Sequence, residues 1–126
     1  MIEKTVLKHS LNEYLNCIDK VNTSFIMQPQ DIHIEVNGDL FVWNASKAEI
    51  NWRKHGIRFE EAATVFGDPM FVLTDASRND EARDAAIGFD VQGRLLFVVH
   101  IEIEATCIRI ISARRAEPHE EVIYAQ

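Results

Sequence analysis

The sequence lacks most of the features that would assign it to a common class of protein. Its longest apolar run, Leu95 to Val99, is far too short to span a bilayer, so we expect no membrane partner. No basic segment followed by an apolar stretch opens the chain, so we expect no secretory signal. The only cysteines, Cys17 and Cys107, have no framework spacing, which favours reduced thiols in a cytoplasmic protein.

Positive charge is also scarce. The 126 residues include 13 Lys and Arg against 20 Asp and Glu, for a net charge of −7. This balance weighs against nucleic acid as a partner, because phosphate binding normally draws on a basic surface. A local basic cleft can still exist in an acidic protein, since binding follows the local potential.

Motifs for metal, nucleotide or serine-hydrolase chemistry are missing too. The five histidines show no paired ligand spacing, and neither cysteine sits in a C-x-x-C motif. There is no glycine-rich phosphate loop, and Ser112 lacks the glycine frame of a nucleophile elbow. We therefore expect no metal and no cofactor.

The sequence does contain patterns typical of secondary structure, and they divide it into two parts. Residues 1–38 read as an N-terminal extension, in which leucines at helical spacing predict an amphipathic helix over 3–21. Alternating apolar residues over 32–36 then reach Asn37-Gly38, a strong hairpin signal, and the returning strand is expected over 40–43. Residues 39–126 read as the main domain.

Within that domain the sequence predicts two helices, an antiparallel meander of about four strands and a closing helix. The first helix begins at a cap, Asn44 or Ser46, and ends at His55 before Gly56. The second covers 59–66. Strands are expected over 70–73, 83–89, 94–103 and 106–112, the third of them covered on both faces, and the closing helix begins near Pro118. This order of elements predicts an α+β fold.

The strand registers decide whether three basic residues meet. With a four-residue loop at 90–93 and a turn at 104–105, Arg83, His100 and Arg109 form one row across three strands, which a one-residue slip would break. Such a row suits RNA cleavage without a metal: a base takes the proton of a ribose 2′-OH and guanidinium groups offset the growing charge. In the plainer interpretation the arginines pair with nearby acids and the histidine lies in the core.

Two further basic pairs are equally open to two interpretations. Lys54-His55 either favours the negative end of its helix or holds phosphate. Arg114-Arg115, beyond the last strand, either holds phosphate or covers a solvated edge. From residue chemistry alone, the sequence supports an α+β domain with an anion-binding sheet face.

Several stretches, in order and spacing, carry a family resemblance: Trp43-Asn44-Ala45-Ser46-Lys47, Asn51-Trp52-Arg53-Lys54-His55-Gly56-Ile57, Phe59-Glu60-Glu61-Ala62, Asp68-Pro69, Glu81-Ala82-Arg83, Ile87-Gly88, Gly93-Arg94-Leu95-Leu96, Val98-Val99-His100 and Ile108-Arg109-Ile110-Ile111-Ser112-Ala113-Arg114-Arg115-Ala116, with Glu120 and Tyr124 beyond them. Together they resemble the BrnT family of ribonuclease toxins. The resemblance implies a RelE-like fold, metal-independent RNA cleavage that halts translation, and neutralisation by a BrnA-type ribbon-helix-helix antitoxin that alone contacts operator DNA. It favours Arg83, His100 and Arg109 as catalytic residues and adds a substrate-binding set of Lys54, His55, Glu60, Arg114 and Arg115.

The sequence departs from the family pattern at three places. Asn44 stands where aspartate is usual, Arg58 where a capping serine or threonine is common, and the acidic stretch 117–122 where relatives tend to be basic. Loss of positive charge there should weaken RNA binding, which leaves a second hypothesis: a catalytically weakened module that binds an antitoxin and acts as co-repressor. In a third, the N-terminal extension covers the active face instead of simply packing on the domain.

Overall fold

The computed structural model describes residues 30–103 and 107–126, so the helix predicted over 3–21 lies outside the described residues. The described elements, in chain order, are β1 (Asp31–Val36), β2 (Asp39–Asn44), α3 (Ala45–His55), α4 (Phe59–Ala63), a 3₁₀ turn η1 (Thr64–Gly67), β3 (Val72–Asp75), β4 (Asp84–Phe89), β5 (Leu95–Ile103), β6 (Cys107–Arg115) and α5 (Pro118–Ala125). None of the described helices is long and apolar enough to cross a membrane.

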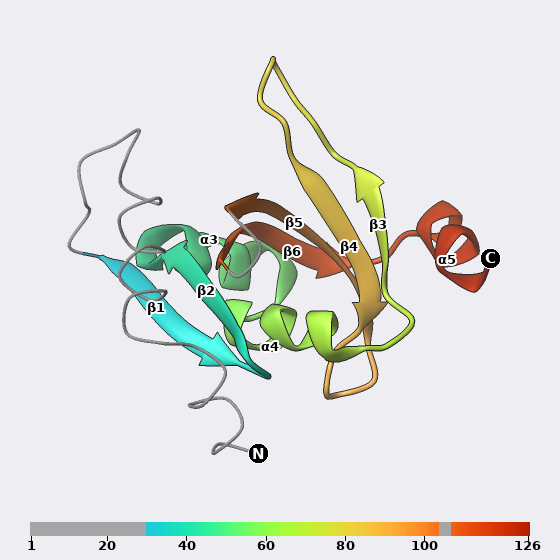
Figure 1. The fold of residues 1–126 in the computed structure, drawn as a ribbon, viewed down its shortest axis with the longest axis horizontal. Helices are drawn as coiled ribbons and strands as arrows, with labels where there is room; N and C mark the ends of the chain where they lie inside the picture. The colour runs from blue at the N-terminus through green and yellow to red at the C-terminus, as the bar shows by residue number, and fades with distance from the viewer. Residues whose placement is uncertain (1–29, 104–106) are drawn as a thin grey trace.

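The strands form one mixed sheet in the order β1-β2-β6-β5-β4-β3 (Figure 1). Strands β3 to β6 pair antiparallel in succession, and β1 and β2 form the hairpin that Asn37-Gly38 predicts, with both turn residues at positive φ. The hairpin joins the meander through a short parallel pairing of β2 with β6, which the sequence did not indicate. The α+β class is confirmed.

The main hydrophobic core lies between the sheet and helices α3 and α4. Trp43 of β2 packs edge-on against Phe59 of α4 with ring centroids 5.8 Å apart, and alternate residues of β5 and β6 complete the cluster. Every second residue of β5 is only partly buried, so the face of this strand away from the helices is covered less completely than the prediction required. Cys107 is disulfide-bonded, so the prediction of a reduced thiol is wrong at this position.

Both strand registers differ by one residue from the predicted ones. In the first hairpin the turn holds three residues, because Gly93 adopts a left-handed φ of 79° and the Asp90 N–H donates to the Arg94 carbonyl oxygen. Asp84, and not Arg83, therefore lies opposite His100. In the second hairpin Ile101, and not His100, lies opposite Arg109. The predicted row of Arg83, His100 and Arg109 is wrong.

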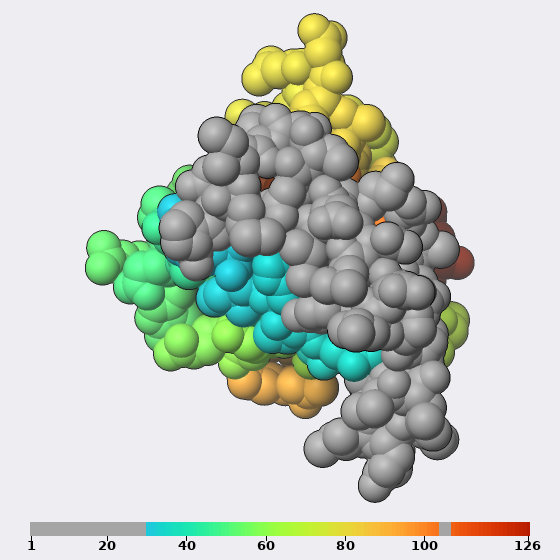
Figure 2. Space-filling model, turned by 60° about the vertical axis from the view of Figure 1, so that its left-hand side comes forward, coloured from blue at the N-terminus to red at the C-terminus, as the bar shows by residue number. Residues whose placement is uncertain are grey.

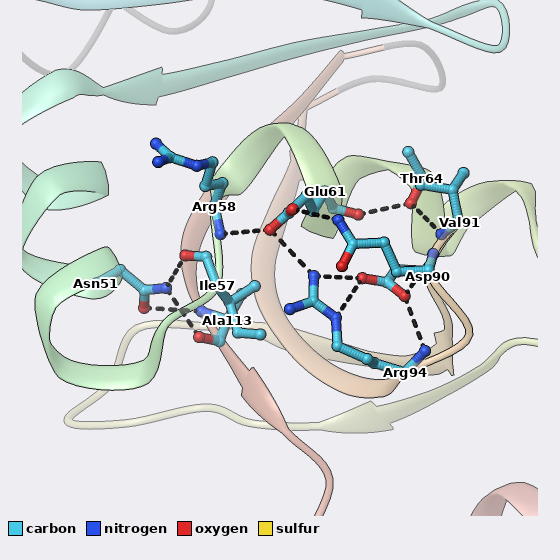
Figure 3. Close-up of polar contacts among 10 residues, drawn as sticks. Asn51, Ile57, Arg58, Glu61, Thr64, Asp90, Val91, Arg94 and Ala113 are labelled. Atoms are coloured by element: carbon cyan, nitrogen blue, oxygen red, sulfur yellow. Dashed lines mark hydrogen bonds and ion pairs between the residues drawn. The ribbon is translucent and has the colours of Figure 1, made fainter.

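Asn51 of α3 takes the place of a missing strand neighbour beside β6. The pairing of β2 with β6 ends at Arg109, beyond which this edge of β6 faces α3. There the buried Asn51 amide donates to the Ala113 carbonyl oxygen at 2.8 Å and accepts from the Ala113 N–H at 3.0 Å. It also donates to the Ile57 carbonyl oxygen at 3.0 Å (Figure 3). Three hydrogen bonds from one side chain thus fix α3 against the sheet. Figure 2 shows the outer surface of α3, in green, beside that of β1 and β2, in cyan.

Two ion-pair groups hold the outer elements in place. Arg94 contacts Asp90 at 2.7 Å and Glu61 at 3.0 Å, which ties the β4–β5 turn to α4 (Figure 3). Both terminal nitrogens of Arg114 donate to the buried Glu120 at 2.8 Å, which ties α5 to the end of β6.

Asn51→Asp tests the strand-replacing amide. The carboxylate keeps an acceptor for the Ala113 N–H but faces the Ala113 and Ile57 carbonyl oxygens without a donor. We expect a loss of about 2–4 kcal/mol in the free energy of unfolding, measured by urea denaturation. Asn44→Asp is the matched control: Asn44 caps α3 by accepting from the Lys47 N–H, a task that aspartate performs equally well, so its stability should match the parent's. Equal losses in both variants would contradict the assignment.

Acid should destabilise the fold through Glu120. Burial would raise the pKa of Glu120, but hydrogen bonds from Arg114 and the Glu117 N–H, together with the charge of Arg114, lower it below 4.5. A carboxylate with a lowered folded-state pKa stabilises the fold above its unfolded pKa, and that stability is lost as pH falls through the folded value. Glu120→Gln should cost about 1–3 kcal/mol at pH 7 and flatten the decline in stability below pH 5. The exposed Glu121→Gln should do neither; an unchanged acid slope in Glu120→Gln would refute the assignment.

Candidate functional site

An open basic pocket lies between α3 and β6. It is lined by Lys47, Ile50, Asn51, Lys54, His55, Ile111 and Ser112. The helical members recur at intervals of three or four residues, so one face of α3 supplies them all. Since Asn51 fixes that face against β6, the charged side chains of α3 stand at a set position along the strand.

A β-bulge in β6 provides the opposite wall. Val99 pairs with Ser112 and His100 with Ile110, so Ile111 is the extra residue of the bulge. A bulge bends its strand and redirects the neighbouring side chains. Here the consecutive residues Ile111 and Ser112 both line the pocket, at the point where the bulge interrupts the alternation of side chains between faces.

The pocket is electrostatically positive. Neither Lys47 nor Lys54 forms an ion pair with a carboxylate of the described residues. Burial, and then the charges of Lys54 and Arg114, lower the pKa of His55 below 6.5. The His55 imidazole is therefore largely neutral near pH 7 and can accept a proton, while the two ammonium groups attract an anion.

The other predicted substrate-binding residues lie outside this lining. Arg114 is bound by Glu120, and its guanidinium carbon also lies 4.3 Å from the ring centroid of Phe97. Its charge still reaches His55, as the pKa shift shows. Arg115 and Glu60 are both exposed, on β6 and α4 respectively, and neither lines the pocket. Of the predicted substrate-binding residues, only Lys54 and His55 line the pocket, together with Lys47. Glu60, Arg114 and Arg115 lie outside the lining.

Arg83, His100 and Arg109 are held apart. Arg83 precedes β4, donates to Glu81 at 3.0 Å and borders an acidic pocket. Arg109 lies between two core residues of β6 and so points to the sheet face away from the helices, where it contacts Asp31 at 3.3 Å. His100 lies on the helix side. Two of the three are paired with a carboxylate, and no single surface gathers them.

His100 has the features of a core histidine. It is 2% exposed, its Nδ1 lies 3.1 Å from the Val98 carbonyl oxygen, and its ring packs edge-on against Phe66 at 4.9 Å. Burial lowers its pKa, against the opposing effects of the Val98 carbonyl, Asp84 and Glu102. The hollow beside it also holds Asp39 and Glu102, so it would repel a phosphate.

One group among the described residues has ligand atoms close enough for a metal ion: Glu117, His119 and Glu120. Its geometry already has an explanation, because the Glu120 carboxylate accepts from Arg114 and from the Glu117 N–H. We assign no metal to it.

Sequence reasoning missed Lys47 and the two β6 residues of the pocket. Lys47 could have been found, because it stands seven residues before Lys54 and so on the same helical face. Ile111 and Ser112 could not, since their placement depends on a bulge for which the sequence carries no signal.

Comparisons with known proteins identify relatives of this chain. The family model described as the ribonuclease toxin BrnT of type II toxin-antitoxin systems matches residues 43–120. Among solved structures, the chain is similar to the Brucella abortus ribonuclease toxin BrnT, at 21% identity and a TM-score of 0.45, over 60% of this chain and 92% of that one. A search of the curated proteins found no match. The family match spans well over half of the chain and includes the whole pocket lining, so this protein belongs to the BrnT family of ribonuclease toxins of type II toxin-antitoxin systems.

Proposed function

We propose that this protein is an endoribonuclease that cleaves RNA at the pocket between α3 and β6 without a metal ion. The observation that carries the proposal is the meeting of an imidazole of lowered pKa with two lysines that pair with no carboxylate of the described residues. Family membership supports a ribonuclease toxin and an antitoxin partner. The pocket is where the chemistry of this chain fits that activity best.

The proposed reaction is an attack within the RNA chain. Neutral His55 takes the proton of a ribose 2′-OH, and the oxygen attacks the adjacent phosphorus. The bond to the 5′-oxygen breaks, which leaves a 2′,3′-cyclic phosphate. The leaving oxygen takes a proton from water, and protonated His55 returns its proton to the solvent. Lys54 and Lys47 offset the negative charge that grows on the phosphoryl oxygens, a task that needs no metal.

The cellular role follows from the family, and we propose it on that ground alone. Cleavage of RNA would halt translation, on a RelE-like fold, until a BrnA-type ribbon-helix-helix antitoxin binds the toxin. Operator DNA would be contacted only through that antitoxin.

One observation favours a second candidate, the catalytically weakened co-repressor module. Arg83, Arg109 and Arg114 are all held by carboxylates, so much of the chain's cationic charge is neutralised within the fold. In that case expression should be harmless to growth, while a tight complex with a ribbon-helix-helix partner should still form.

His55→Ala and Lys54→Ala test the proposed site. In buffer with EDTA, we expect RNA cleavage to fall about 10²–10⁴-fold in His55→Ala, which removes the base. Lys54→Ala should lose about 10²-fold, through charge stabilisation. Arg78→Ala, an equal loss of charge on an exposed loop, should cleave at the parent's rate. A further variant, Arg83→Ala, separates this site from the row predicted by sequence: a loss of cleavage there, with His55→Ala active, would overturn our assignment.

The pH profile gives an independent readout. Because the pKa of His55 is lowered, the base stays neutral at pH 7 and becomes protonated only below its usual value of 6.5. We expect kcat/KM to decline on the acid side of that value in the parent and to show no such limb in the residual activity of His55→Ala. If growth is unaffected by expression and no variant or parent cleaves RNA, the co-repressor module is the correct function.

A further inference from the structure

Beside the pocket, the guanidinium of Arg58 lies over the ring of an exposed tryptophan. Its guanidinium carbon is 4.1 Å from the ring centroid of Trp52, whose side chain is 39% exposed. Arg58 stands where a capping side chain is expected, yet only its backbone takes part in the cap. Its N–H donates to the Glu61 carboxylate at 3.0 Å, and its carbonyl oxygen accepts from the N–H groups of Glu61 and Ala62. In Figure 3 the guanidinium points away from Glu61 and Asp90. It pairs with no carboxylate of the described residues.

The local backbone sets this stack next to the proposed phosphate site. Trp52 and His55 are three residues apart on α3, so their side chains are neighbours on its surface. Gly56 then ends the helix at a left-handed φ of 70°, and the chain turns back so that Arg58 returns over Trp52. The stack and the pocket therefore share the C-terminal end of α3.

We propose that the Trp52–Arg58 stack holds a nucleobase of single-stranded RNA, next to the phosphate bound by Lys54 and His55. The guanidinium lies over the indole ring and Arg58 is exposed, so the planar group is held in place by Trp52 and remains accessible to a base. Aromatic rings and guanidinium planes are the surfaces on which proteins stack unpaired bases. A duplex offers no such base, so the stack selects single strands. This inference rests on the proposed function.

The stack adds a binding contribution that charge alone does not supply. A cation attracts any polyanion, whereas a stacked base requires the base itself. The two effects separate when the same sugar-phosphate backbone is offered with and without bases. The comparison also distinguishes a stacking role of Arg58 from a merely structural one.

The test measures affinity for a short, mixed-sequence 2′-O-methyl RNA, which has no free 2′-OH to attack, and for its abasic counterpart. By fluorescence anisotropy, the parent should bind the RNA with bases about tenfold more tightly than the abasic strand. Trp52→Leu and Arg58→Lys should bind the abasic strand as the parent does but lose most of that preference. Arg58→Lys keeps the charge and removes only the plane. Both residues are exposed, so these variants should fold, which circular dichroism checks.

Arg53→Lys is the matched control. Arg53 lies on the same helix, is exposed and pairs with Glu49 at 3.0 Å, so its variant should keep the tenfold preference. Equal binding of both strands by the parent, or an unchanged preference in Arg58→Lys, would overturn the stacking proposal and leave the proposed ribonuclease site intact. If the parent binds neither strand and cleaves no RNA, both proposals fail together.

Discussion

The packing of α3 against the sheet depends on the side-chain amide of Asn51, which replaces the hydrogen bonds of a neighbouring strand. Asn51 makes with Ala113 the pair of hydrogen bonds that a neighbouring strand would make, at the point where β6 has lost its partner. An unpaired buried N–H and carbonyl would be costly there, so the position of α3 along β6 is closely set. Helix α3 and strand β6 form the two walls of the basic pocket, so the contact between Asn51 and Ala113 sets the geometry of the pocket.

The distribution of partners resolves the conflict between an acidic chain and an RNA substrate. Several carboxylates pair with arginines and hold elements of the fold together. Glu61 of α4 pairs with Arg94, and Glu120 of α5 pairs with Arg114. Lys47 and Lys54 have no carboxylate partner among the described residues and stand on one helical face. The net charge of −7 describes the whole surface, whereas a phosphate responds to the potential where it binds.

Local signals in the sequence predicted the elements well, and long-range geometry was beyond them. Asn37-Gly38 and Gly56 act through their own backbone angles, so the hairpin and the end of α3 could be read directly. The register of β4 with β5 depended on whether Gly93 closes a three-residue turn, and a one-residue error there separated Arg83 from His100. The bulge at Ile111 and the parallel junction of β2 with β6 depend on packing between distant segments.

The same limits apply to the candidate site. Lys54 and His55 were found because they are adjacent in sequence and their helix was correctly bounded. The sequence left open whether His100 lies in the core, because alternation alone cannot distinguish burial against Phe66 from an exposed position. The carboxylate that pairs with Arg109 could not be identified, because Asp31 is far away in sequence.

The ion pair between Arg114 and Glu120 has a consequence beyond the position of the last helix. Arg114 is one of the two cations whose charge lowers the pKa of His55, and Glu120 of α5 holds the Arg114 guanidinium. Any event that pulls α5 from the sheet would leave Arg114 without its counter-ion and free to move, and would so change the charge that acts on His55. The position of the C-terminal helix can therefore affect the proton affinity of a histidine some sixty residues earlier in the chain.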